Sequence, residues 1–341
     1  MGIIPIPLII WLIEDLLYLI IFPGLVTILV IVIVIIWLER KIAAKVQMRF
    51  GPLWVSKKIG GALQSLADLL RYSFQEVIIP EKADKLAFIL APGLMFAFAT
   101  IALIFIPVGP YYSVLFPSYY TILFSLALII ITPIFAITVG WASDNKFSFI
   151  GALREGFLLI SYEVPFLLSV VSMIIIFRTY DYISAVQSQL SFLPGIILNP
   201  LAALTMLIVM IRTTGRFPFD ITEADSELVL GLYTEYSALF FGVGMATPYV
   251  ELYNFSLIFS LLFLGGWWPF TLNVMNPIYG LILPGIIVVI KAFIVMAILV
   301  FLRAVYPRYR LDQAVRSGWS YVLLLSVLSV ILSVGEVVFL R

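Results

Sequence analysis

The sequence predicts an all-α integral membrane protein with eight transmembrane helices, an amphipathic surface helix in the first cytoplasmic loop and a bent sixth helix. The 341-residue chain is 63% hydrophobic and only 11% charged, with a mean hydropathy of +1.16, whereas soluble domains carry about 25% charged residues. The apolar residues form runs long enough to cross a bilayer, and the basic residues lie between these runs. We therefore expect residues 1–341 to form a single transmembrane domain.

The eight expected spans follow from length, because a helix crosses the hydrocarbon layer with about 20 apolar residues. They are 17–38, 86–107, 119–140, 154–177, 197–213, 233–265, 281–303 and 318–339. The sixth segment is too long for one straight crossing and contains Pro248 and Glu251. Length alone therefore leaves two short spans or one kinked helix.

The basic residues decide between these two topologies, because Lys and Arg accumulate in cytoplasmic loops. With eight spans, the loops on one side hold 17 of the 20 Lys and Arg residues, nine of them in the loop 39–85. Splitting the sixth span would move the basic cluster at 303–316 to the opposite side. We therefore predict eight spans with both termini outside, and interpret Glu39-Arg40-Lys41 and Arg308-Tyr309-Arg310 mainly as topology anchors.

The first loop contains an amphipathic pattern at 60–76. Four apolar residues share one helical face: Leu63, Leu66, Leu70 and Phe74. Four polar residues tend to the other face: Gln64, Asp68, Arg71 and Gln75. This segment is too polar to span the bilayer, so we expect a helix that lies along the membrane surface.

Two residue types are absent, and they limit the chemistry of the chain, which has no Cys and no His. Iron–sulfur clusters need thiolates and haem usually takes a His or Cys ligand, and catalytic zinc usually does as well. We therefore expect no iron–sulfur cluster, haem or zinc and no other metal site. The sequence also lacks a basic nucleic-acid-binding motif, so we expect no nucleic-acid partner.

Three charged residues lie inside expected spans: Glu163 in the fourth, Glu251 in the sixth and Lys291 near the centre of the seventh. A charge at the bilayer centre costs about 2.5–3.5 kcal/mol on insertion scales, and such a residue usually faces a partner or a polar interior. One interpretation is a structural ion pair between helices. The other, which three such residues together favour, is a proton relay.

The acidic residues are concentrated between the fifth and sixth spans, in GRFPFDITEADSELVLGLYTEYS at 215–237. Five of the chain's 19 acids lie there: Asp220, Glu223, Asp225, Glu227 and Glu235. If 220–227 is helical, Asp220, Glu223 and Glu227 lie on one face, within about 60° of each other. Apolar residues flank the acids, and few basic residues follow Arg216, which argues against a simple solvated loop.

The motifs in the chain resemble those of subunit 1 of complex I, the corresponding membrane subunit of NADH-quinone oxidoreductase. They are LERK at 38–41, RFGP at 49–52, QSLAD at 64–68, SYEVP at 161–165, PFDITEADSEL at 218–228, EYS at 235–237, FLGGW at 263–267 and PRYRLDQ at 307–313. The resemblance covers about 39–319. It implies eight transmembrane helices, and a subunit that anchors the peripheral arm, forms much of the quinone chamber and couples quinone reduction to proton translocation.

The resemblance also assigns residues. Those matching acids that the family is proposed to use for proton coupling are Glu163, Glu223, Asp225, Glu227 and Glu235, to which their position inside spans adds Glu251 and Lys291. Those at motif positions near the quinone chamber and its rim are Arg40, Arg49, Gln64, Asp68, Arg216, Phe219 and Asp220. Quinone is the expected substrate, and no redox centre is expected in this chain itself.

The resemblance implies partners as well. Iron–sulfur subunits of a peripheral arm are expected on the cytoplasmic side, antiporter-like and small subunits within the membrane, and lipid around them. The expected location is the cell membrane, meaning the plasma or inner membrane, with the chain crossing it several times. In this interpretation the chain is a non-redox subunit of a multi-subunit quinone oxidoreductase and translocase.

Several positions depart from the family pattern. Leu53 follows Pro52 where the family often has Asn, Ser65 replaces a Pro, and Asp225 replaces a Glu. Pro248 lies where the family often has a Glu in the sixth helix. Glu251, about one helical turn further on, could restore a carboxylate on a similar face.

Two alternatives stay open. The same fold could serve as the ion-translocating anchor of a ferredoxin-linked, membrane-bound hydrogenase-type complex that uses no quinone. A stand-alone secondary transporter would also contain intramembrane charges, although the sequence lacks the evident internal repeat that many such transporters have.

Overall fold

The computed structural model describes residues 24–110, 118–191, 193–269 and 277–339. Within these ranges the chain forms helices and short turns and no strand. The helices are α2 (Leu25–Val46), α3 (Gln64–Phe74), α4 (Lys85–Ala102), α5 (Thr121–Ala142), α6 (Lys146–Phe177), α7 (Tyr182–Ser191), α8 (Gly195–Leu198), α9 (Pro200–Thr213), α10 (Asp225–Leu228), α11 (Ala238–Leu262), α12 (Pro277–Val305), α13 (Leu311–Ser317) and α14 (Leu323–Phe339).

Capping residues set where several helices begin. The Asn145 side chain accepts a hydrogen bond from the Phe147 amide at the start of α6, and Asp84 does the same for Ala87 at the start of α4. Asn199 caps α9, with Pro200 at the first helical position, where its fixed φ and missing N–H cost nothing. The prediction that the fourth helix starts at 154 is therefore wrong, because Asn145 starts it at Lys146.

Every expected span overlaps a helix, and five helical stretches are long and apolar enough to cross a membrane among the residues that the structure describes. These stretches are Lys85–Phe105, Thr121–Ala142, Lys146–Phe177, Leu283–Val305 and Leu311–Phe339. The expected crossing by α2 begins at 17, partly outside the described residues. The full number of eight crossings stays a prediction.

The expected sixth span is one continuous helix, α11, which runs through Pro248. It is shorter than the predicted 233–265, because Gly231–Tyr233 forms a separate 3₁₀ turn. At its other end Gly265 and Gly266 have φ values of 72° and 52°, a backbone conformation that suits glycine and ends the helix. A bend at Pro248 stays a prediction.

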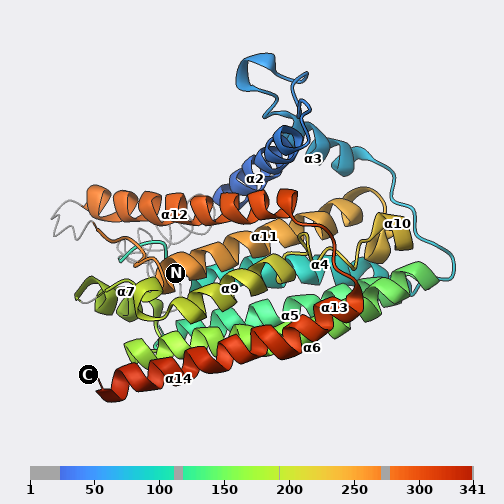
Figure 1. The fold of residues 1–341 in the computed structure, drawn as a ribbon. Coiled ribbons are helices and arrows are strands. Elements are labelled where there is room, and N and C mark those ends of the chain that lie inside the picture. Colours follow the sequence, from blue (N-terminus) through green and yellow to red (C-terminus); the bar gives the residue numbers. More distant parts are fainter. Residues whose placement is uncertain (1–23, 111–117, 192, 270–276, 340–341) are drawn as a thin grey trace, which may run out of the picture.

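The long helices run alongside one another, with α12 on one side of the bundle and α6 and α14 on the other (Figure 1). In the same view α10 and α13 lie toward one end of these helices, and α7 and the C terminus lie toward the opposite end. α2 crosses the bundle obliquely. The connections that carry most basic residues thus leave from a common end, as the charge distribution predicts.

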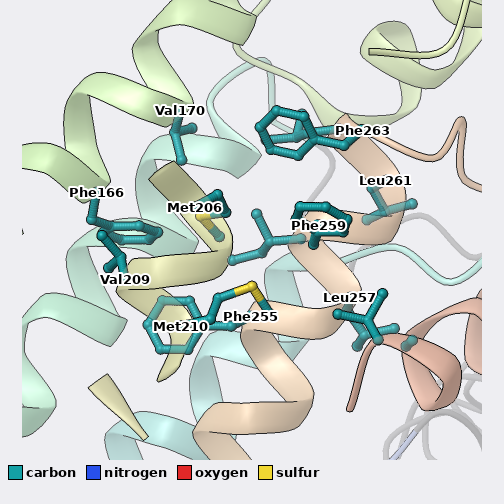
Figure 2. Packing of buried hydrophobic residues seen from close by; sticks show 14 of the residues in the cluster. Phe166, Val170, Met206, Val209, Met210, Phe255, Leu257, Phe259, Leu261 and Phe263 are labelled. Carbon is teal, nitrogen blue, oxygen red and sulfur yellow. The ribbon is translucent and has the colours of Figure 1, made fainter. Parts of the chain in front are cut away.

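The main core lies where α6, α9 and α11 meet (Figure 2). Phe166 of α6 packs edge-on against Phe255 of α11, with ring centroids 5.2 Å apart. Met206 and Met210 of α9 are fully buried between them. Aromatic rings prefer this edge-to-face arrangement, and methionine fills the gaps that it leaves. This packing fixes the three helices that carry Glu163, Arg212 and Glu251.

Candidate functional site

Two neighbouring cavities open beside the C-terminal end of α2. One has a volume of about 510 Å³ and is lined by Arg40, Arg49, Phe50, Gly51, Pro52, Leu53, Trp54 and Gln64. The other has a volume of about 440 Å³ and is lined by Glu39, Arg40, Ala43, Gln47, Arg49, Phe217, Tyr249, Val300, Arg303, Ala304 and Tyr306. Arg40 and Arg49 line both, so the cavities adjoin at these two side chains.

A chain of polar contacts holds the first cavity's wall. Arg40 Nη1 donates to Asp68 Oδ2 at 2.6 Å, and Gln64 Nε2 donates to Asp68 Oδ1 at 3.1 Å. These contacts tie α2 to α3. Arg49 Nε donates only locally, to Gln47 Oε1 at 2.7 Å, so most of its guanidinium faces the cavities.

Glu39 lies at the centre of a second cluster, beside the 440 Å³ cavity. Its side chain is 6% exposed, and it forms ion pairs with Arg216 (3.1 Å) and Arg303. The Tyr249 hydroxyl donates to its other oxygen at 3.4 Å. One carboxylate therefore joins α2, α11, α12 and the segment that follows α9.

Arg216 is the most enclosed of the predicted chamber residues, at 3% exposure. Burial lowers the pKa of its guanidinium to about 10, and nearby Tyr249, Glu223 and Glu251 oppose this effect. The group therefore stays protonated near neutral pH. Its ring contact with Tyr249, 5.1 Å from the ring centroid, adds a cation–π interaction.

Glu163 and Glu251 face the same small internal cavity, with Thr213 beside them. Its volume is about 10 Å³, close to the minimum that holds one water molecule. Glu251 is 5% exposed, and Glu163 Oε1 is buried without a hydrogen-bond partner among the described residues. The structure thus brings together two carboxylates that the sequence places 88 positions apart.

Arg212 lies within electrostatic reach of both carboxylates. It is 2% exposed, and its Nη2 donates to the side chain (2.9 Å) and backbone carbonyl (3.1 Å) of Glu155. Its Nε and Nη1 have no partner in the described part of the chain. Glu155, Glu163, Arg212 and Glu251 therefore form one buried charge cluster among α6, α9 and α11.

The acidic stretch is not the single helix that would align Asp220, Glu223 and Glu227. Only Asp225–Leu228 is α-helical, so a shared helical face is wrong. Gly231, at φ 54°, approaches the Thr222 carbonyl so closely that no side chain fits between them. This close approach folds the stretch back on itself and excludes a continuous helix.

Distant basic and amide groups hold the acids instead. Arg308 pairs with Asp220 at 2.9 Å, Arg154 pairs with Glu227 at 2.6 Å, and Asn145 Nδ2 donates to Glu235. Glu223 interacts electrostatically with Arg216. The side chain of Asp225 lies outside the part that the structure describes. Charge compensation, which the local sequence lacks, therefore comes from α6 and from the α12–α13 connection.

Phe219 provides the apolar contact of this stretch. Its ring packs edge-on against Tyr162 of α6 (5.2 Å) and against Tyr309 (5.6 Å). Neither Phe219 nor Asp220 lines the two cavities described above. Both residues therefore fix the acidic stretch to its neighbours.

Comparison with known proteins identifies the family. The family model for NADH dehydrogenase matches residues 19–334. The H subunit of the F(420)H(2) dehydrogenase from Methanosarcina acetivorans is 34% identical over 88% of this chain and 87% of its own length. The H subunit of the NADH-quinone oxidoreductase from Dehalococcoides mccartyi is 34% identical over 95% of this chain and 87% of its own length. The one from Syntrophotalea carbinolica is 33% identical over 90% and 92%.

The chain belongs to the NADH dehydrogenase family of complex I subunit 1. The resemblance seen in the sequence motifs is thereby confirmed. Together with the five apolar helices, membership of the complex I subunit 1 family makes this a multi-pass membrane protein.

Sequence reasoning missed part of the site in this member of the complex I subunit 1 family. The sequence indicates mainly topology anchors for Glu39 and Arg308, yet each forms an ion pair at the site. It gives no indication of Tyr249, Arg303 or the Arg212–Glu155 pair. The signal available for Glu39 was its place as the first acid after a long apolar run, which suggests a buried end of a helix but names no partner.

Lys291 does not join the charge cluster. Its Nζ donates to three backbone carbonyls of the loop after α11: Leu264 (2.7 Å), Gly266 (2.8 Å) and Trp268 (2.7 Å). These three bonds satisfy the ammonium group and tie α12 to the end of α11. Its assignment to proton coupling stays a prediction, and the geometry favours a structural role.

Replacing Lys291 with methionine should therefore lower stability. Hydrogen bonds to charged groups contribute about 1.5–3 kcal/mol each, so we expect a loss of about 2 kcal/mol or more and a lower unfolding temperature in detergent. Lys82→Met, at an exposed turn, is the matched control. An unchanged unfolding temperature combined with lost proton pumping would instead identify Lys291 as a proton carrier.

Proposed function

We propose that this chain is the membrane subunit of a complex I-type oxidoreductase, which accepts electrons from NADH or another donor and reduces quinone. In this proposal the chain forms much of the quinone chamber and couples quinone reduction to proton translocation. Relatives named as NADH-quinone oxidoreductase and as F(420)H(2) dehydrogenase subunits are equally similar to it, at 34% identity. The membrane subunit is thus common to complexes whose names give different donors.

The observation that supports the chamber most is the pair of adjoining cavities at Arg40 and Arg49. Their linings combine apolar walls, such as Phe50, Trp54 and Val300, with guanidinium and amide donors. A quinone needs an apolar surface for its ring and tail and hydrogen-bond donors for its carbonyl oxygens. Arg40, Arg49 and Gln64 are positioned to provide those donors.

The support for coupling is the succession of buried charges behind the chamber. Glu39 borders the 440 Å³ cavity and pairs with Arg216, which interacts electrostatically with Glu223 and Glu251. Glu251 in turn shares a cavity with Glu163. Reduction of a quinone to a quinol takes up two electrons and two protons. A change of charge in the chamber would therefore be felt along this succession, which is the physical requirement for driving proton movement.

The electrons would come from partner subunits. This chain has neither Cys nor His, the usual ligands of iron–sulfur clusters and haem. We propose that iron–sulfur subunits of a peripheral arm dock at the end of the bundle that carries α10 and α13. Antiporter-like and small membrane subunits would continue the proton path, and the cell membrane would be the location of the whole complex.

A photoreactive quinone analogue tests the chamber in the purified complex. We expect covalent labelling of peptides that contain the cavity residues 49–54 and 300–306, and suppression of that labelling by excess quinone. Arg49→Ala should reduce labelling several-fold, whereas Lys82→Ala, which lies outside both cavities, should not. If the complex is active with a ferredoxin-type donor and no quinone-suppressible labelling occurs, the chain is the anchor of a hydrogenase-type complex instead.

A further inference from the structure

The connection after α2 is strongly basic. Between Lys41 and Ala67 the sequence contains no acidic residue and five basic ones. These are Lys41, Lys45, Arg49, Lys57 and Lys58. Lys45, Lys57 and Lys58 are exposed, and no carboxylate pairs with them in the described part of the chain. The local positive charge is therefore uncompensated by the protein.

The same connection exposes large apolar side chains. Met48 is 95% exposed, Phe50 92% and Trp54 81%. Lys57 Nζ lies 4.7 Å from the centroid of the Trp54 ring, so an ammonium group and an aromatic ring form one surface. A surface that combines unpaired cations with exposed aromatic residues matches the interfacial region of a bilayer, where tryptophan rings and lysine ammonium groups both lie.

The apolar side chains of α3 extend this surface. Leu66 is 37% exposed, Leu70 50% and Phe74 86%, on a helix whose Asp68 faces inward to pair with Arg40. Their polar neighbours therefore make contacts within the protein, while the apolar side chains remain outside. A helix with this arrangement gains free energy when its apolar face contacts lipid.

The direction of the connection decides which partner it fits. In Figure 1 the chain between α2 and α3 extends sideways from the long helices, beyond α12, and not past their ends. Because the long helices cross the membrane, a sideways extension lies over lipid. A partner that docks on the end of the bundle would meet α10 and α13, which lie at that end.

We propose that the basic segment 41–58 binds the anionic phospholipid headgroups of the leaflet on its own side of the membrane. Lys45, Lys57 and Lys58 contact the phosphates, while Trp54 and the apolar face of α3 enter the region of the acyl chains. Clusters of Lys and Arg directly after a membrane helix attract anionic lipids in this way. The lipid binding is separate from the proposed quinone chemistry, because none of the three lysines lines a cavity.

Lipid retention tests the proposal. The full-length chain is reconstituted in nanodiscs of phosphatidylcholine with 10 mol% phosphatidylglycerol, and the lipids it retains after mild solubilisation are counted by native mass spectrometry. We expect selective retention of phosphatidylglycerol. One lysine contributes about a five-fold gain in membrane affinity, so the triple substitution Lys45→Gln, Lys57→Gln and Lys58→Gln should reduce this retention at least ten-fold.

The control removes the same charge elsewhere. Lys82, Lys85 and Lys146 are exposed and, by the charge distribution, lie on the same side of the membrane, but acids lie close to them in sequence. Changing all three to glutamine should leave phosphatidylglycerol retention unchanged. Equal losses in both triple variants would mean that only net charge matters, and would overturn a site at 41–58.

A spin label measures where the segment lies. The chain has no native cysteine, so Val55→Cys, at a position that is 48% exposed, provides a unique attachment point in the unaltered lysine background. We expect the nitroxide to be accessible to oxygen and shielded from a water-soluble nickel chelate in nanodiscs that contain phosphatidylglycerol. Full accessibility to the nickel chelate would overturn the proposal. If the lysine variants then also release peripheral subunits from the assembled complex, the surface binds an acidic protein instead.

Discussion

Replacement of Glu39 with glutamine is expected to destabilise the chain by about 3–5 kcal/mol and to reduce quinone reductase activity at least ten-fold. Removing one partner of a buried ion pair leaves the other charge uncompensated, and this cost is typically of that size. Here two guanidinium groups, those of Arg216 and Arg303, lose their carboxylate. Arg216 cannot escape by losing its proton, because its pKa remains at about 10 even when buried.

The measurement combines the unfolding temperature of the purified chain with quinone-linked turnover of the assembled complex. Glu81→Gln, at an exposed position, changes the same chemical group without affecting a buried charge and should be neutral. Adding Arg303→Gln to Glu39→Gln should recover part of the stability, since one surplus cation is removed. Wild-type stability in Glu39→Gln would contradict the ion-pair cluster as described.

Replacement of Glu163 with glutamine is expected to leave assembly intact and to reduce quinone-linked proton pumping at least ten-fold. Glutamine keeps the size and hydrogen-bonding capacity of the side chain but cannot carry a proton as a carboxylate does. Glu163 Oε1 has no hydrogen-bond partner among the described residues, so the substitution should break few structural contacts. The effect would therefore report on proton transfer.

Glu251→Gln extends this test, because Glu251 faces the same cavity as Glu163. If both carboxylates act in one succession, the double variant should pump no worse than the more affected single variant. Glu227→Gln tests the acidic stretch; its side chain is 55% exposed, so little stability should be lost. Glu76→Gln, also exposed, is the control. Full pumping by both Glu163→Gln and Glu227→Gln complexes would refute the proposed coupling.

The helices could be predicted from the sequence because a bilayer imposes a simple requirement of length and hydropathy. Their ends were less predictable. α6 begins eight residues before the predicted start, since Asn145 caps it, and α2 continues through charged residues as far as Val46. Hydropathy does not report either effect, because caps and partly buried charged turns lie outside the apolar run.

The candidate site was predictable in its residue types and less so in its pairings. Motifs located Arg216, Asp220 and the acids that follow, but the partners of Asp220 and Glu227 lie 88 and 73 positions away. Such pairs depend on how helices pack, and no local pattern encodes that. Lys291 illustrates the opposite error: its charge suggested a carboxylate partner, whereas backbone carbonyls satisfy it.

The contacts of the acidic stretch also constrain how the protein is made. Asp220 pairs with Arg308, the amide of Tyr309 donates to the carbonyl of Pro218, and the rings of Phe219 and Tyr309 pack together. Synthesis at about 5–20 residues per second separates these partners by several seconds. During that interval the stretch waits at the membrane without its final contacts. Its surface for other subunits is therefore completed only after the ribosome has passed residue 309, which orders biogenesis so that the chain is nearly whole before assembly begins.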